Sequence, residues 1–247
     1  MFVTDRRLWA ASVGLLAALF AASGAIQAED TKAQHSAVKR ADKKDKFWVD
    51  RHHRFLNRAK KGEVEVLFLG DSITQGWEGS GKEVWTKHFE PLKSANFGIG
   101  GDRTQHVLWR ITEGKELEGI SPKAAVLMIG TNNMGSNSAE EIADGVKAIV
   151  AELRHQKPHM KVLVLGVFPR SAKASDKVRD KIKEVNTSIA KLDDGKNVKY
   201  LDIGDKFLEP DGSLSKDIMP DYLHLSKKGY QIWADAVGPT LEDMLKK

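Results

Sequence analysis

The chain of 247 residues contains no cysteine. This absence excludes disulfides, a thiol nucleophile and thiolate metal sites, so the fold must depend on its hydrophobic core alone. The H-E-x-x-H pattern of zinc-binding helices and the G-x-G-x-x-G pattern of dinucleotide loops are missing as well. The sequence therefore predicts neither a metal centre nor a cofactor site.

Long apolar runs are also absent once the first residues are passed. Beyond residue 28 no run is long enough to span a membrane. At the N-terminus, Arg6 and Arg7 precede an apolar stretch from Leu8 to Phe20 and small residues up to Ala28. This order is typical of a secretory signal peptide, so we expect residues 1–28 to direct export to the periplasm or the medium. An uncleaved membrane anchor is the alternative, for which the run is short.

The charge balance gives little indication of a charged partner. The formal net charge is +5, and in the lysine-rich stretch 39–61 the aromatic residues are not interleaved with the basic ones in a stacking pattern, so the sequence predicts no nucleic-acid partner. We interpret this stretch as the solvated face of a helix and its linker. Residues 29–45 are polar and are predicted to be a flexible lead-in to a single domain over 46–247. A homodimer is left open.

Five short apolar runs alternate with helical patterns. The first run, residues 64–69, is nearly continuous in apolar residues, which is typical of a strand buried on both faces of a parallel sheet. The predicted strands are 64–69, 95–97, 124–129, 161–167 and 198–203. Helices are expected over 47–56, after the capping box Ser138/Glu141, over 178–192, and from Ser226 with a kink or restart at Pro239. The alternation predicts an α/β fold with three layers, α/β/α, around a five-stranded parallel, flavodoxin-like sheet.

Polar residues gather at the carboxyl ends of the predicted strands, where an open parallel sheet binds its ligands. Gly70-Asp71-Ser72 follows the first strand, and a serine on such a turn exposes its hydroxyl at a helix N-terminus. The nucleophile-elbow pattern G-x-S-x-G fails because position 74 is threonine. Taken alone, this motif favours a helix N-cap for Ser72 over a nucleophile.

Two further turns and one residue pair complete a hydrolase pattern. Gly101 lies in a glycine-rich turn and Asn132 follows the third strand, where each could donate an N–H to an oxyanion or merely shape a turn or cap. Asp221 precedes His224 by three residues, close enough for the carboxylate to orient the imidazole. Together these residues supply a nucleophile, oxyanion donors and a base.

These same residues carry a resemblance to a known family. Gly70-Asp71-Ser72, Gly101, Asn132 and the Asp221/His224 pair resemble the four sequence blocks of the SGNH/GDSL hydrolases. A closer similarity, from about Trp48 to Leu245, is to the catalytic subunits of the platelet-activating-factor acetylhydrolases; it is carried by residues 96–111, 130–133, 168–170 and 221–225.

The resemblance implies a serine esterase that works through an acyl-enzyme. Ser72 would be the nucleophile, and Asp221 and His224 the activating pair. The backbone N–H groups of Ser72 and Gly101 and the side chain of Asn132 would form the oxyanion hole.

The neighbours of these residues predict a shallow acyl pocket. Ile73, Thr131 and Leu223 each adjoin a candidate catalytic residue and are expected to border the acyl group. Overpacking of such a pocket would favour acetyl esters over longer ones.

The sequence leaves three hypotheses for the substrate class. Residues 74–81 depart from the animal acetylhydrolases, and bacterial secreted relatives look closer, so a carbohydrate O-acetyl esterase is the first hypothesis. A lipid esterase is the second, and a silent glycan-binding module is the third. Trp77 and Trp85 could line a lipid rim or stack on sugar rings.

Overall fold

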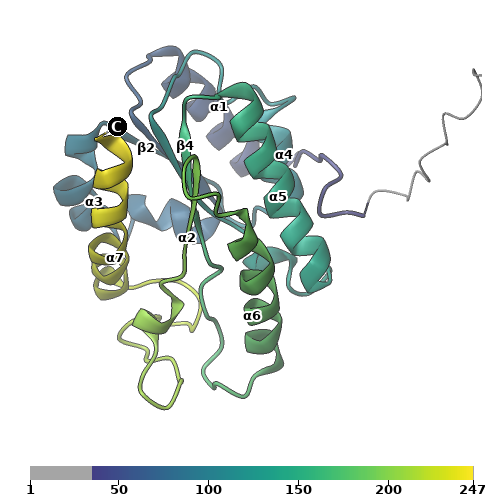
Figure 1. Ribbon diagram of the computed structural model, residues 1–247, viewed down its shortest axis with the longest axis vertical. Helices are drawn as coiled ribbons and strands as arrows, with labels where there is room; N and C mark the ends of the chain where they lie inside the picture. Colours follow the sequence, from purple (N-terminus) through teal and green to yellow (C-terminus); the bar gives the residue numbers. More distant parts are fainter. Residues whose placement is uncertain (1–34, 247) are drawn as a thin grey trace, which may run out of the picture. The chain divides into compact units, whose positions relative to one another are not determined.

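A computed structural model describes residues 35–246, which form a five-stranded parallel sheet between two layers of helices (Figure 1). The strand order is β2-β1-β3-β4-β5, which confirms the predicted flavodoxin-like arrangement. The strands are β1 Val66–Gly70, β2 Ser94–Gly98, β3 Ala124–Met128, β4 Lys161–Leu165 and β5 Val198–Leu201. All five lie where the apolar runs predicted them. The predicted signal peptide, residues 1–28, lies outside the described residues.

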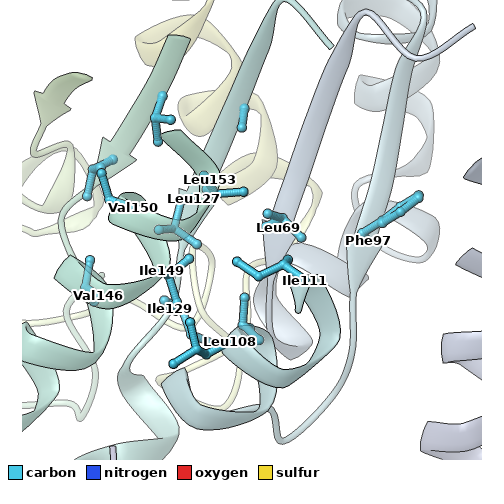
Figure 2. Close-up of a cluster of buried hydrophobic side chains, with 14 of the residues drawn as sticks. Leu69, Phe97, Leu108, Ile111, Leu127, Ile129, Val146, Ile149, Val150 and Leu153 are labelled. Atoms are coloured by element: carbon cyan, nitrogen blue, oxygen red, sulfur yellow. The ribbon is translucent and has the colours of Figure 1, made fainter. Parts of the chain in front are cut away.

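The two faces of the sheet bury alternate residues of each strand. In β1, Leu67 and Leu69 join the core on one face, and Val66 and Phe68 join the core on the other. The first face is covered by α1 Lys46–Lys60, α4 Thr104–Ile111, α5 Ala139–Gln156 and α6 Lys177–Ile189, and part of its packing is shown in Figure 2. The second is covered by α2 Ser72–Gln75, α3 Lys82–His88 and α7 Lys227–Leu245. Short 3-10 turns are η1 Gly76–Glu78, η2 Glu90–Leu92, η3 Thr131–Asn133, η4 Ala190–Leu192 and η5 Gly204–Phe207.

The predicted helices are confirmed where apolar residues recur at helical spacing along the whole element, as in α1, α5, α6 and α7. The capping box before α5 is confirmed, because the Glu141 N–H donates to the Ser138 hydroxyl over 3.1 Å and the Ser138 N–H donates to the Glu141 carboxylate over 3.0 Å. The predicted restart at Pro239 is wrong, since α7 runs through it. The buried stripe of Val237 and Leu241 continues across the proline and keeps both halves on the sheet.

Helices α3 and α4 were not predicted. Helix α4 buries polar side chains, among them Thr104, Gln105 and Arg110, and these residues interrupt its apolar stripe in the sequence. Helix α3 has only 7 residues, too short for a periodic pattern to stand out.

The described part of the expected flexible lead-in, residues 35–45, lies against the domain. Ala37 is fully buried, and its carbonyl accepts a hydrogen bond of 2.8 Å from the Thr104 hydroxyl of α4. The Ala41 N–H donates to the Gln105 carbonyl, and Asp45 caps α1 by accepting from the Trp48 N–H over 2.9 Å. We call residues 35–45 the strap, because these contacts tie it from α4 to α1.

Candidate active site

The candidate site lies beyond the carboxyl ends of the strands, at the point where the chain leaves β1 for α2. Gly70 ends β1, and a side chain there would place its Cβ 2.1 Å from the Thr74 hydroxyl, so only glycine permits this turn. Asp71 caps α2 by accepting a hydrogen bond of 3.0 Å from the Ile73 N–H. Ser72 is therefore the first residue of α2 and is only half buried.

Ser72, His224 and Asp221 form one hydrogen-bonded chain. The His224 Nε2 lies 2.9 Å from the Ser72 hydroxyl oxygen, and its Nδ1 lies 2.7 Å from the Asp221 carboxylate. The structure thus brings together residues that are 152 positions apart in the sequence. A general base in hydrogen-bond contact with a serine and an orienting carboxylate is the geometry that activates a serine nucleophile.

The turn that carries the histidine is strained. Tyr222 adopts a φ of 59°, in the left-handed region that residues other than glycine seldom occupy. This conformation lets one Asp221 oxygen accept from the N–H groups of both Leu223 and His224, over 3.0 and 2.7 Å. Strain held in this way by surrounding contacts is typical of functional sites.

The environment of Asp221 favours its charged form. Partial burial raises the pKa of the carboxyl, but the hydrogen bonds from the His224 ring and from the backbone N–H groups of His224 and Leu223 outweigh it. The pKa of Asp221 is therefore held below its ordinary value, and the group is a carboxylate at neutral pH. Its negative charge lies beside the imidazole and would stabilise an imidazolium ion.

The turn that carries the candidate oxyanion donor Gly101 lies next to Ser72. A Cβ built on Gly100 would lie 3.8 Å from the Cβ of Ser72, so the turn after β2 approaches the nucleophile closely. Gly101 next to it has a φ of +72°, which glycine adopts without cost. The Asn132 amide donates to the carbonyl of Asp102 over 2.8 Å. An amide nitrogen carries two hydrogens, so the second can serve an oxyanion.

The three residues expected to border the acyl group differ in exposure. Ile73 and Thr131 are each only 1% exposed, so their side chains offer almost no surface to a ligand in this structure. Ile73 packs into the core beneath α2, and Thr131 accepts hydrogen bonds from the Arg170 guanidinium through its carbonyl and hydroxyl. Leu223 is partly exposed and is the remaining candidate for an acyl contact.

The two tryptophans expected near the substrate pack against the core, one buried and one partly exposed. Trp77 is 1% exposed and packs against Tyr230 and Trp233 of α7. Trp85 packs edge-on against Phe68 of β1. The burial of Trp77 corrects the hypothesis that this side chain stacks on a substrate, because its apolar area is already used in folding. Trp85 is only partly buried.

An aromatic residue that the sequence placed only in a helix lies at the site. Phe47 of α1 is 55% exposed, and its ring edge would lie 4.0 Å from a Cβ built on Gly100. Within residues 35–246 it is the one large hydrophobic side chain that is exposed. Its helical spacing also fits a packing residue, so the sequence alone did not mark it as a site residue.

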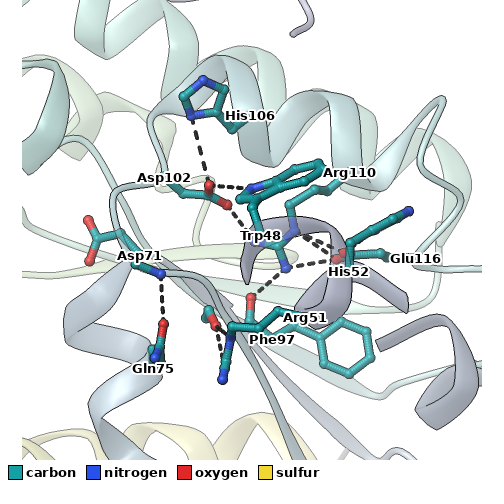
Figure 3. Close-up of polar contacts among 12 residues, drawn as sticks. Trp48, Arg51, His52, Asp71, Gln75, Phe97, Asp102, His106, Arg110 and Glu116 are labelled. Carbon is teal, nitrogen blue, oxygen red and sulfur yellow. Dashed lines mark hydrogen bonds and ion pairs between the residues drawn. The ribbon is translucent and has the colours of Figure 1, made fainter. Parts of the chain in front are cut away.

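A buried polar network supports the turn after β2 (Figure 3). Asp102 is fully buried; it accepts from the Trp48 indole over 2.7 Å and from the Arg110 guanidinium over 2.9 Å. Arg110 also pairs with the buried Glu116 over 2.7 Å, and Glu116 is bonded to His52 over 2.7 Å. Buried charges need such partners, so this network fixes the loop that follows Gly100.

Comparison with protein families decides the identity of the fold. Residues 68–232 match the model of the GDSL-like lipase/acylhydrolase family. The chain belongs to the GDSL family.

Curated relatives agree with this assignment. The human platelet-activating factor acetylhydrolase IB subunit alpha1 is 44% identical over 187 residues, which are 75% of this chain and 79% of the human protein. The rat alpha2 subunit is also 44% identical, over 190 residues covering 75% of this chain and 80% of the rat protein. A GDSL-like lipase from Bacteroides thetaiotaomicron shares the fold, with a TM-score of 0.64 at 20% identity, covering 78% of this chain and 97% of the lipase. This GDSL protein is therefore a carboxylic ester hydrolase.

Two features are absent from the described part of this GDSL hydrolase. No group of three or more His, Asp or Glu side chains within residues 35–246 is arranged to hold a metal ion. No helix in the same range has the length and apolar character needed to cross a membrane.

Proposed function

We propose that this GDSL hydrolase removes acetyl groups from carbohydrate esters through an acyl-enzyme on Ser72. The hydrogen bond of 2.9 Å between Ser72 and His224 carries the proposal. The Ser72 oxygen attacks the ester carbonyl while its proton moves to the His224 Nε2. The tetrahedral intermediate then expels the sugar alcohol, which takes that proton, and a water molecule repeats the sequence to release acetate.

The remaining candidate residues would stabilise charge during these steps. Asp221 holds the imidazole in the required tautomer and offsets its positive charge. The backbone N–H groups of Ser72 and Gly101 and the side chain of Asn132 would receive the negative oxygen of the intermediate. No step in this scheme uses a metal ion or a cofactor.

The surface around the site supports a carbohydrate leaving group. An enzyme that docks on a lipid aggregate needs a contiguous apolar patch. Within residues 35–246, Phe47 alone is a large and exposed hydrophobic side chain. A single aromatic ring at the rim of a polar site suits stacking against the face of a sugar ring.

A lipid esterase is the second candidate, and one observation favours it. The relatives of 44% identity are named as acetylhydrolases of platelet-activating factor, which is an acetylated phospholipid. Both candidates share the acetyl group and the same catalytic residues, so only the leaving group distinguishes them.

A side-by-side substrate screen tests the proposed function. Acetate release would be measured from acetylated xylan, acetylated monosaccharides, p-nitrophenyl acetate and acetyl-phospholipid, with Ser72→Ala as the blank. We expect the carbohydrate esters to be preferred, and Ser72→Ala to lose at least a thousandfold in rate on all of them while its circular dichroism is unchanged. Half the wild-type activity in Ser72→Ala would exclude this mechanism, and preference for the phospholipid would favour the second candidate.

Phe47 variants test the leaving-group contact in the same screen. Phe47→Ala should raise KM several-fold for acetylated sugars and leave p-nitrophenyl acetate turnover within about twofold, since a stacked ring is worth about 1 kcal/mol. Phe47→Trp, which keeps an aromatic face, should retain the wild-type KM. Equal KM values in Phe47→Ala and the wild type would remove the ring from substrate binding.

The acyl-chain preference follows from the small exposed surface at Leu223. Each added methylene gains about 0.8 kcal/mol on burial, but overpacking in a shallow pocket costs about 1–3 kcal/mol. We therefore expect kcat/KM to fall from acetyl to octanoyl p-nitrophenyl esters, and Leu223→Ala to flatten the fall. A wild-type optimum at hexanoyl or longer would contradict the shallow pocket.

We also propose export to the periplasm or the medium, on the basis of the charged and apolar pattern of residues 1–28. Fractionation of cells that produce the full chain, with N-terminal sequencing of the recovered protein, tests this. Recovery of uncleaved protein in the cytoplasm would contradict it.

A further inference from the structure

The strap places a lysine beside the candidate oxyanion hole. The Lys43 ammonium lies 3.4 Å from the carbonyl oxygen of Gly100 and 3.4 Å from the carboxylate of Asp102. A Cβ built on Gly101 would lie 3.2 Å from the same nitrogen. The side chain is only 22% exposed, so the ammonium rests on the turn of residues 100–102 rather than in open solvent.

Asp102 links this turn to the rest of the site. Its side chain is bonded to Trp48 and Arg110, and its backbone carbonyl accepts from the Asn132 amide. A shift of Asp102 would therefore move both candidate oxyanion donors. The Gly101 N–H would move because Gly101 directly precedes Asp102, and the Asn132 side chain would move because it is hydrogen-bonded to the Asp102 carbonyl.

The charge on Asp102 needs positive neighbours. Burial raises the pKa of its carboxyl, and the charges of Arg110 and Lys43 oppose that shift. His106 lies 3.8 Å away, but burial and the nearby cations lower its pKa to about 4, so it is neutral at pH 7. Arg110 divides its hydrogen bonds between Asp102 and Glu116. Lys43 contributes the positive charge that faces Asp102 from the strap.

We propose that Lys43 is a positioning residue, which bridges the Gly100 carbonyl and the Asp102 carboxylate and so holds the oxyanion donors of this GDSL hydrolase in place. The inference rests on the proposed function, because it assigns these donors to ester hydrolysis. The strap that carries Lys43 is anchored independently by the burial of Ala37 and by the Asp45 cap of α1. The backbone at Lys43 is therefore held in place on both sides.

Kinetics of three variants test the proposal. Lys43→Met should lower kcat for p-nitrophenyl acetate about tenfold with KM within twofold of the wild type, a smaller loss than removal of a direct oxyanion donor. Lys43→Arg keeps the charge and should recover most of the rate. Lys44→Met is the matched control, because Lys44 is the neighbouring strap residue and is exposed; it should retain the wild-type rate.

Hydrogen exchange supplies a readout that does not depend on the substrate. Amides of residues 98–104 should exchange several-fold faster in Lys43→Met than in the wild type or in Lys44→Met. Unchanged exchange together with a kcat within twofold of the wild type would overturn the role of Lys43, and so would a Lys43→Arg variant as slow as Lys43→Met. A wild type that hydrolyses no ester, but shows the exchange difference, would refute the proposed function and leave the structural role of Lys43 standing.

Discussion

Asn132 has an observed contact within the fold and a proposed role in the chemistry of the site. Its amide donates one hydrogen to the Asp102 carbonyl, which leaves the second for the proposed contact with the oxyanion. Arg170 steadies the η3 turn that carries Asn132 by donating to Thr131. Arg170 belongs to the motif of residues 168–170 and was not predicted as a site residue. Its position after β4, beyond the carboxyl end of the strand, was the signal that could have identified it.

Removal of the Asn132 amide should slow the chemical step. Asn132→Ala is expected to lower kcat by about 10²–10³ with little change in KM, since an oxyanion donor acts mainly in the transition state. Steady-state kinetics with p-nitrophenyl acetate measure both constants. A rise in KM with kcat unchanged would assign Asn132 to substrate binding instead.

Asp71 beside the nucleophile should make stability depend on pH. Burial raises its pKa to about 7, against a hydrogen bond from the Ile73 N–H that favours the charge, and its second carboxylate oxygen has no hydrogen-bond partner in the structure. The folded protein therefore keeps the proton to a higher pH than the unfolded chain, in which the pKa is near 4. This contribution to stability is complete below about pH 4 and is lost as the pH rises through about 7.

The variant Asp71→Asn removes this titration and keeps a side chain that can cap α2. Between pH 5 and pH 8, we expect the free energy of unfolding of the wild type to fall by about 2–3 kcal/mol relative to that of Asp71→Asn. Urea unfolding at the two pH values measures the difference, and any fixed cost of the buried amide cancels. Parallel pH profiles of the two proteins would contradict it.

At the scale of elements, glycines decide how closely helices and the strap approach. A Cβ on Gly145 of α5 would lie 2.5 Å from the Thr104 hydroxyl of α4 and 2.8 Å from the Ala37 carbonyl of the strap. Gly145 is thus required where three segments meet. Gly238 of α7 offers the opposite case, with no neighbouring atom within 4 Å of its built Cβ.

This pair of glycines gives a matched stability test. Alanine improves helix propensity by about 1 kcal/mol, but at Gly145 overpacking costs about 1–3 kcal/mol. At Gly238 the gain is offset, because the Cβ of a helical residue that precedes a proline, here Pro239, crowds the proline ring. Gly145→Ala should therefore lower the free energy of unfolding, while Gly238→Ala should change it by no more than about 0.5 kcal/mol. Urea titrations of both variants measure the two changes. If Gly145→Ala were as stable as Gly238→Ala, the strap and α4 would be able to move apart to admit the methyl group without a loss in the free energy of unfolding.

At the scale of the whole molecule, the proposed mechanism stabilises charge with side chains and backbone N–H groups of the protein. Within residues 35–246, no cluster of three or more His, Asp or Glu side chains is arranged to hold a metal ion. Dialysis against EDTA is expected to leave ester hydrolysis unchanged, measured as kcat/KM before and after treatment. Loss of activity that zinc or calcium restores would place a metal in the reaction.

The architecture could be predicted because each strand and most helices are marked by a pattern of apolar residues within a short stretch of the sequence. A strand buried on both faces requires a continuous apolar run, and Val66 to Leu69 is buried as such a run demands. The places of Ser72, Gly101 and Asn132 followed, because residues after parallel strands must meet at one edge of the sheet. The pairing of Asp221 with His224 was readable for the same reason, since three residues separate them.

Only the tertiary structure decided which side chains face the substrate and which support the loop. Whether Ile73, Trp77 or Phe47 is exposed depends on helices from distant parts of the chain, which bury the first two and leave Phe47 at the rim. The contact between Lys43 and Asp102 joins residues from the strap and the turn after β2, and no local pattern encodes such a distance. Sequence periodicity reports on the neighbours of a residue along one element, whereas burial and charge pairing are set by the packing of several elements at once.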